Sequence, residues 1–182
     1  MPQPVCAIIG AGEGLGKALA TKFANNGFNL ALVSRSQAGS AAALHAATTI
    51  TPNVKFFQAD AEKPETIEAA LARVAAIMGE IHVLIYNCRG RFSACAPLDM
   101  TYDALTKNFN VEVIGALAAA KSVLPAMIKG PAEVFFFQVQ PLLTEDQTLT
   151  QFIRLVNLAF ALYRRALPKH IPLMECTLYM LD

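Results

Sequence analysis

An apolar run that leads directly into a glycine-rich turn constrains this chain more than any other feature. Val5–Ile9 has the continuous apolar character of a buried parallel strand. Gly10, Gly14 and Gly16 follow it, and the residues from Leu15 onward favour a helix. Glycine accepts positive φ and lets a ligand approach the backbone closely, and the free N–H groups of a helix start bind anions. The arrangement predicts a strand–turn–helix unit that can hold a pyrophosphate.

Strands and helices are predicted to alternate along the chain. The expected strands are Val5–Ile9, Asn29–Ser34, Val54–Ala59, His82–Tyr86 and Glu133–Val139, and the expected helices are Gly14–Asn25, Gln37–Ala47, Lys63–Met78 and Tyr102–Ile128. The last is expected as two helices that meet near Asn108–Asn110, and Gly79 is expected to end the third helix. This order predicts an α/β fold: one Rossmann-type domain over residues 1–182, with a doubly wound parallel sheet in three αβα layers.

The amino-acid composition indicates which partners and which cellular compartment are to be expected. Hydrophobic residues make up 54% of the chain and charged residues 16%, as expected when a sheet is covered on both faces. A net charge of +1 does not favour a nucleic-acid partner. The four cysteines show no C-x-x-C pair and no zinc-type spacing, so we expect no metal site and thiols in a reducing cytosol. We also expect no signal peptide and no apolar stretch that approaches the length of a membrane span.

The glycine turn resembles that of the short-chain dehydrogenase/reductase family, and the resemblance covers roughly residues 4–130. Gly10-x-x-x-Gly14-Leu15-Gly16 is similar to the family's G-x-x-x-G-[IL]-G, although Ile9 stands where threonine is usual. The resemblance implies that these residues bind the pyrophosphate of a nicotinamide dinucleotide.

The end of the second strand is where this family selects its cofactor. Ser34-Arg35 stands there; in relatives an acidic residue binds the ribose 2′-hydroxyl, whereas an arginine faces a 2′-phosphate. Arg35 therefore favours NADP(H) over NAD(H), while Glu13 argues the other way because phosphate-binding relatives often carry a basic residue before the second glycine. Asp60 matches the adenine-contacting aspartate of the family, and equally fits an ordinary loop carboxylate.

Two further segments resemble family motifs with substitutions. Tyr86-Asn87-Cys88-Arg89 is similar to the N-N-A-G element that borders the cofactor, but only Asn87 is unchanged and Arg89 replaces the glycine. Phe109–Gly115 is similar to F-x-V-N-V-x-G, and Glu112 falls where the family has a catalytic asparagine.

The resemblance ends after Gly130, where the family carries its chemistry. Relatives use a serine after the fifth strand and a Y-x-x-x-K helix, in which lysine lowers the pKa of the tyrosine that moves the proton. Here the predicted strand ends in Phe137-Gln138-Val139-Gln140 without a serine, and Tyr163 is followed by Leu167 rather than lysine. We therefore assign no catalytic residue, and expect residues 131–182 to be a divergent tail that leaves the C-terminal part of the fold truncated or altered.

Two explanations of the tail stay open. In the reading frame that starts one base earlier, the codons for Phe152–Asn157 permit Y-x-x-x-K, and those for Phe137-Gln138 give serine or proline. This favours a frame change near Gly130. The alternative is a true variant, because Leu155, Leu158 and Leu162 stand at helical spacing.

Three functional hypotheses follow. The favoured one is an NADP(H)-dependent oxidoreductase that transfers hydride between the nicotinamide and a small carbonyl or alcohol substrate. The others are a dinucleotide-binding protein without catalysis, and a truncated product without function whose open sheet edge would associate. The resemblance also implies a homodimer or homotetramer formed through the long helices. The small residues Gly115–Ala120 fit such an interface, and equally fit a helix packed on the sheet.

Overall fold

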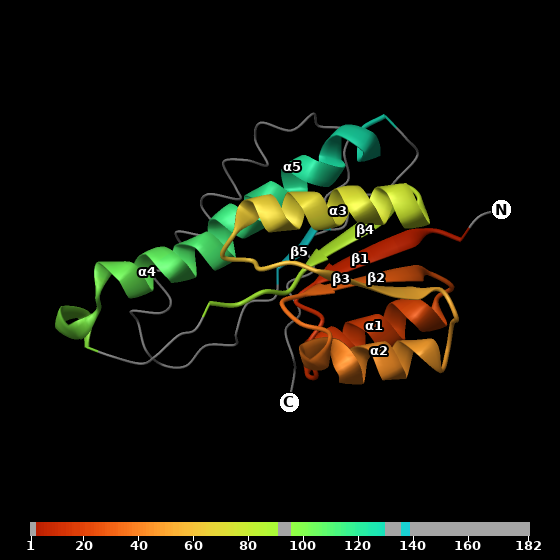
Figure 1. The fold of residues 1–182 in the computed structure, drawn as a ribbon, viewed down its shortest axis with the longest axis horizontal. Helices are drawn as coiled ribbons and strands as arrows, with labels where there is room; N and C mark the ends of the chain where they lie inside the picture. The colour runs from red at the N-terminus through yellow and green to blue at the C-terminus, as the bar shows by residue number, and fades with distance from the viewer. Residues whose placement is uncertain (1–2, 91–95, 130–135, 139–182) are drawn as a thin grey trace.

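The computed structural model describes residues 3–90, 96–129 and 136–138 (Figure 1). The strands are β1 (Val5–Ile9), β2 (Asn29–Ser34), β3 (Val54–Gln58), β4 (Ile81–Tyr86) and β5 (Phe136–Gln138). The helices are α1 (Leu15–Asn25), α2 (Ala41–Thr48), α3 (Pro64–Met78), α4 (Tyr102–Phe109) and α5 (Gly115–Met127), with short 3-10 turns at Ala38–Ser40 and Pro97–Asp99 and a π-helical segment at Asn110–Ile114. The predictions for the tail, including the missing Y-x-x-x-K helix and the frame change, lie outside the described residues.

The strands form one parallel sheet in the order β3-β2-β1-β4-β5. Ile9 at the end of β1 pairs with Val33 on one side and with Tyr86 on the other. The chain order reverses between β1 and β4, so the crevice outside their carboxyl ends is the topological switch point where such sheets bind ligands. The prediction of a doubly wound parallel sheet is confirmed.

Helices cover both faces of the sheet, which explains the continuous apolar strands. Ala7 and Ile9 of β1 pack into the cluster formed with α3 and α5, whereas Cys6 and Ile8 pack into the cluster formed with α1 and α2. Figure 1 shows α3 and α5 on one side of the sheet and α1 and α2 on the other. Since both faces are buried, alternation between polar and apolar residues is absent from β1 and β2.

Element boundaries follow the prediction within a few residues. The helix expected at Gln37–Ala47 begins as a 3-10 turn at Ala38–Ser40, and its α-helical part is Ala41–Thr48. Gly79 ends α3 with φ +96°, as expected of a glycine that follows a helix. The sequence did not predict the irregularity at the start of β4. Val5 pairs with Ile81 and Cys6 with Val83, and Nδ1 of the intervening His82 accepts a hydrogen bond from the Val5 N–H (3.2 Å).

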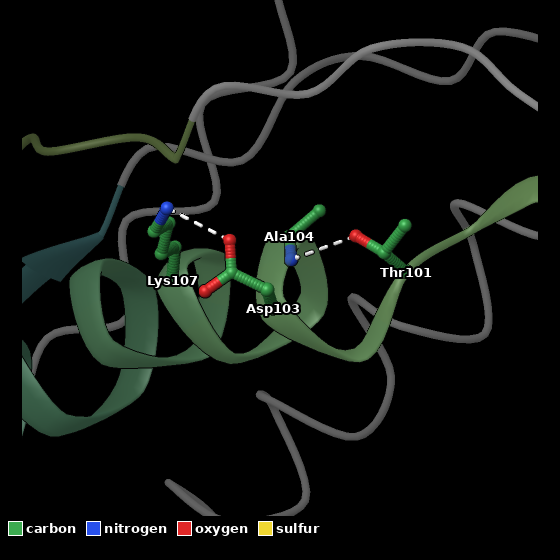
Figure 2. Close-up of polar contacts among 4 residues, drawn as sticks. All are labelled: Thr101, Asp103, Ala104 and Lys107. Atoms are coloured by element: carbon green, nitrogen blue, oxygen red, sulfur yellow. Dashed lines mark hydrogen bonds and ion pairs between the residues drawn. The ribbon is translucent and has the colours of Figure 1, made fainter.

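The two helices expected over Tyr102–Ile128 meet near the predicted junction, because α4 ends at Phe109. The π segment Asn110–Ile114 joins α4 to α5, and α4 extends away from the sheet in Figure 1. Thr101 caps α4 by accepting a hydrogen bond from the Ala104 N–H (3.2 Å), and Lys107 pairs with Asp103 (2.8 Å; Figure 2).

The inner face of α5 consists largely of small residues. Ala116, Ala119 and Ala120 are buried in the cluster shared with α3 and the sheet, which is the second of the two arrangements considered for these residues. The expectation about apolar length was wrong, because Tyr102–Met127 is long and apolar enough to cross a membrane by length and composition. Core helices meet the same test, and α5 packs as one: its buried side chains lie against α3 and β4.

Candidate functional site

The turn after β1 brings backbone segments so close together that two of its glycines are sterically required. Gly10 has φ +87°, and a Cβ atom there would lie 2.6 Å from the carbonyl oxygen of Asn87. A Cβ atom at Gly16 would lie 2.7 Å from the carbonyl oxygen of Gly10. Real Cβ contacts are longer than this, so any side chain at either position would displace backbone. At Gly14 a Cβ would meet nothing within 4 Å, so this glycine leaves open space at the helix start.

Helix α1 begins at this open space without a cap from a side chain. Gly14 is the N-cap residue, no side chain accepts from the first turn, and the first turn contains no acidic residue. The first N–H groups of a helix have no partner within the helix, and the helix dipole places partial positive charge there. Leu15 and Glu13 are exposed beside it. The corner between β1 and α1 therefore has the properties of an anion-binding site.

The end of β2 supplies a second, positively charged part of the site at the carboxyl end of the sheet. The Ser34 hydroxyl donates to the Ser36 carbonyl (2.9 Å) and lies 2.7 Å from the buried Ser40 Oγ, so it holds the following loop. The Arg35 side chain is exposed, and its carbonyl accepts a hydrogen bond from Gln58 Nε2 (3.0 Å). The backbone at Arg35 is thus tied to β3, while its side chain is exposed to solvent.

Asp60 lies just past the end of β3 and serves a local turn. Its N–H donates to Thr66 Oγ1 (2.9 Å), and its Oδ1 accepts from the Glu62 N–H (3.2 Å). Asp60 therefore stabilises the turn before α3, and its role as an adenine contact stays a prediction.

The charges of Arg35 and Asp60 both act on Cys88, in the loop after β4. Burial raises the pKa of Cys88 to about 12; a hydrogen bond with Tyr86 and the charge of Arg35 lower it, and the charge of Asp60 raises it. The ends of β2, β3 and β4 therefore lie within electrostatic reach of one another.

Asn87 joins the end of β4 to the glycine turn. Its Nδ2 donates to the Gly10 carbonyl (2.9 Å), and its N–H donates to the Ile9 carbonyl (2.7 Å). The one unchanged residue of the N-N-A-G-like element thus fixes the turn that follows β1.

Three residues near Asn87 have roles that sequence reasoning did not find. The buried Tyr86 phenol donates to the Val111 carbonyl in the π segment, and burial, followed by Cys88 and Glu112, raises the Tyr86 pKa above its ordinary range. Glu112 Oε1 accepts a hydrogen bond from the Gly90 N–H (3.1 Å). A Cβ at Gly90 would overlap the Asn108 side chain, so Gly90 lies close to α4.

Comparison with known proteins identifies the family. The family model for short chain dehydrogenase matches residues 4–134. The chain belongs to the short-chain dehydrogenase/reductase family. It is 31% identical over 132 residues to "Oxidoreductase UcpA" of Salmonella typhimurium, with coverage of 67% of this chain and 46% of that protein.

Solved structures of short-chain dehydrogenases and reductases have the same fold. The crystal structure of levodione reductase matches with a TM-score of 0.68 at 26% identity, over 73% of this chain and 53% of that one. A metagenomic short-chain oxidoreductase in complex with NADP matches with a TM-score of 0.70 at 19% identity, over 76% and 63% of the two chains. The chain spans about half the length of the curated relatives it matches.

The parallel sheet brings all the predicted cofactor-binding residues to one edge. Those at the β1–α1 corner are Gly10, Gly14, Leu15 and Gly16, and those at the ends of β2, β3 and β4 are Ser34, Arg35, Asp60 and Asn87. Within residues 3–90, 96–129 and 136–138, no cluster of three His, Cys, Asp or Glu side chains could hold a metal ion.

Proposed function

We propose that this chain is the NADP(H)-binding part of a short-chain oxidoreductase that acts on a small carbonyl or alcohol substrate. The observation that carries the proposal is the β1–α1 corner: an uncapped helix start opens beside the switch point between β1 and β4. Membership of the family supports it, as do related structures that carry NADP. The bound cofactor would supply the hydride acceptor or donor at its nicotinamide ring.

The residues at this edge fit a dinucleotide phosphate. The backbone at Gly12 and Gly14 faces open space, so a pyrophosphate could approach the N–H groups at the helix start. In this proposal Gly10, Gly14, Leu15 and Gly16 form the pyrophosphate site. Ser34 shapes the loop that presents Arg35 to a 2′-phosphate, Asp60 borders the adenine, and Asn87 borders the ribose.

The cofactor preference rests on Arg35. Its exposed guanidinium can pair with a phosphate, whereas Glu13, beside the helix start, disfavours added negative charge. We expect NADPH to bind more tightly than NADH because the attraction between Arg35 and the 2′-phosphate outweighs the repulsion from Glu13, which lies within the glycine turn.

Fluorescence titration of NADPH and NADH tests the proposal. We expect Arg35→Ala to weaken NADPH binding by about tenfold, the value of one charge-assisted contact, and to leave NADH binding unchanged. Lys22→Ala, which removes an exposed cation from the far end of α1, is the matched control and should change neither affinity. Stronger binding of NADH would overturn the cofactor assignment, and failure to bind either dinucleotide would overturn the proposed function.

A binding protein without catalysis is the second candidate, and Glu112 favours it. This carboxylate stands where the family has a catalytic asparagine, and it is hydrogen-bonded to the Gly90 backbone. The sequence also lacks the serine and the Y-x-x-x-K motif in its written frame. An assay of NADPH oxidation with a panel of small ketones and aldehydes separates the two candidates: turnover supports the oxidoreductase, and binding without turnover supports the binding protein. The single domain, the homo-oligomer and the cytoplasmic location stay predictions.

A further inference from the structure

Two hydrogen bonds connect the end of β4 to the π segment between α4 and α5. The first runs from the Tyr86 phenol to the Val111 carbonyl. Space for the phenol comes from Gly115, because a Cβ there would lie 2.5 Å from Tyr86 Oη and 2.6 Å from the Ala61 carbonyl oxygen. A π turn departs from the regular α-helical hydrogen-bond ladder, and such turns are often found at functional sites. The buried phenol thus fixes the π segment against the strand.

The second bond runs from the Gly90 N–H to Glu112 Oε1. Gly90 packs closely against Asn108, so a side chain at position 90 would require the Asn108 side chain to move. Residues 87–90 are therefore held at both ends: Asn87 binds the Gly10 carbonyl, and Gly90 binds the Glu112 carboxylate. A carboxylate is a stronger acceptor than the neutral amide that the family carries at this position.

Arg35 and residues 87–90 lie on opposite sides of β1. Arg35 follows β2 and residues 87–90 follow β4, and the sheet order places β2 and β4 on either side of β1. Gly90 contacts Asn108 and Glu112, at the junction of α4 with the π segment. A dinucleotide bound across the switch point places its two halves on opposite sides of β1. If Arg35 marks the adenosine half, then Gly90 and Glu112 border the nicotinamide half.

We propose that Glu112 is a positioning residue that holds residues 87–90 in the shape required by the nicotinamide half of the cofactor. This inference rests on the proposed function. It assigns Glu112 an effect on dinucleotide affinity through the Gly90 backbone, whereas Arg35 acts on the adenosine half directly. Loss of the carboxylate should then lower the affinity for the intact dinucleotide and leave unchanged the affinity for a ligand that consists of the adenosine half alone.

Amide hydrogen exchange at Gly90 tests the contact without any cofactor. We expect exchange at Gly90 to be about tenfold faster in Glu112→Ala, because the N–H loses a charged acceptor. Glu112→Gln keeps an oxygen acceptor and should retain most of the protection. Glu68→Ala, which removes an exposed glutamate from α3, should leave exchange at Gly90 unchanged. Unchanged exchange in Glu112→Ala would overturn the proposal.

Binding of two ligands tests the consequence for the cofactor. We expect Glu112→Ala to weaken NADPH binding by about tenfold and to leave binding of adenosine 2′,5′-bisphosphate unchanged, with Glu112→Gln close to the unaltered chain. Arg35→Ala should weaken both ligands. Equal losses for both ligands in Glu112→Ala, or no loss for NADPH, would overturn the positioning role. If the unaltered chain binds neither ligand, the proposed function fails and this inference fails with it, although the exchange result would still report the contact.

Discussion

The candidate site at the carboxyl end of the sheet has two sides that are built in different ways: the β1–α1 corner and the end of β4. At the β1–α1 corner, backbone lies against backbone, and Gly10 and Gly16 are needed because they lack side chains. At the end of β4, side chains make the contacts: Tyr86 reaches Val111, and Glu112 reaches Gly90. The first side follows the family pattern closely, and the second departs from it at several positions. The backbone-built side tolerates little change, because any side chain at Gly10 or Gly16 would displace backbone.

The largest expected effect comes from adding a methyl group at Gly10. Gly10→Ala combines an unfavourable φ of +87° with a Cβ 2.6 Å from the Asn87 carbonyl oxygen, and should lower the free energy of unfolding by about 4 kcal/mol. Gly27→Ala is the matched control, since Gly27 has φ +80° and open space around its Cβ position; it should cost about 1 kcal/mol. Urea denaturation measures both, and equal losses would show that the close approach at Gly10 contributes nothing.

Removal of the Tyr86 hydroxyl tests the side-chain contacts at the end of β4. Tyr86→Phe leaves the buried ring in place but takes the donor from the Val111 carbonyl, so we expect a loss of about 2 kcal/mol in urea denaturation. Tyr102→Phe, at an exposed tyrosine on α4, should cost nothing measurable. If Tyr86→Phe is equally harmless, the phenol does not hold the π segment.

Titration of Cys88 offers a pH-dependent test of the same edge. Burial raises its pKa to about 12, so the folded protein keeps the thiol proton at pH values where the unfolded chain loses it. Stability should therefore be complete below the unfolded pKa and fall as pH rises above about 8.5, with Cys88 contributing about 2 kcal/mol of the loss by pH 10. Cys6 and Tyr86, whose pKa values burial also raises, act in the same direction. Cys88→Ala should reduce the fall in the free energy of unfolding between pH 8 and 10, as measured by urea denaturation at each pH. An unchanged fall would contradict the raised pKa of Cys88.

The smallest effect on stability is expected in α4, whose side-chain contacts lie away from both the β1–α1 corner and the end of β4. Thr101→Ala removes the cap of α4 shown in Figure 2 and should cost about 0.5 kcal/mol because the helix end is exposed; Thr101→Ser should restore it. Lys107→Ala breaks an exposed ion pair and should leave the urea midpoint unchanged. A larger loss for Thr101→Ala than for Tyr86→Phe would invert the comparison.

Local sequence patterns predicted the β1–α1 corner and most of the fold. Apolar runs located the strands, and glycine spacing located the turn because both signals lie within a few consecutive residues. The roles of Tyr86 and Glu112 depend on partners 25 and 22 residues away, which no local pattern specifies. The strand irregularity at His82 and the π turn are also set by contacts with other elements rather than by periodicity.

One signal in this part of the site is a glycine that the comparison with the family motif does not use. Gly90 directly follows Arg89, which stands at the glycine position of the N-N-A-G-like element. A glycine beside a strand end often marks a close backbone approach, and that signal could have directed attention to Asn108 and Glu112.

The π segment sets the rotational phase of everything that follows it in the helix. A π turn holds more residues than an α turn, and one residue corresponds to a rotation of about 100° around a helix axis. Ala116, Ala119 and Ala120 of α5 face α3 and the sheet in this phase, whereas α4 buries none of its side chains. A relative that lacks one residue here would point a different stripe of α5 at the core. An insertion or deletion within Asn110–Ile114 would therefore reassign which residues of α5 are interior, without altering a single one of them.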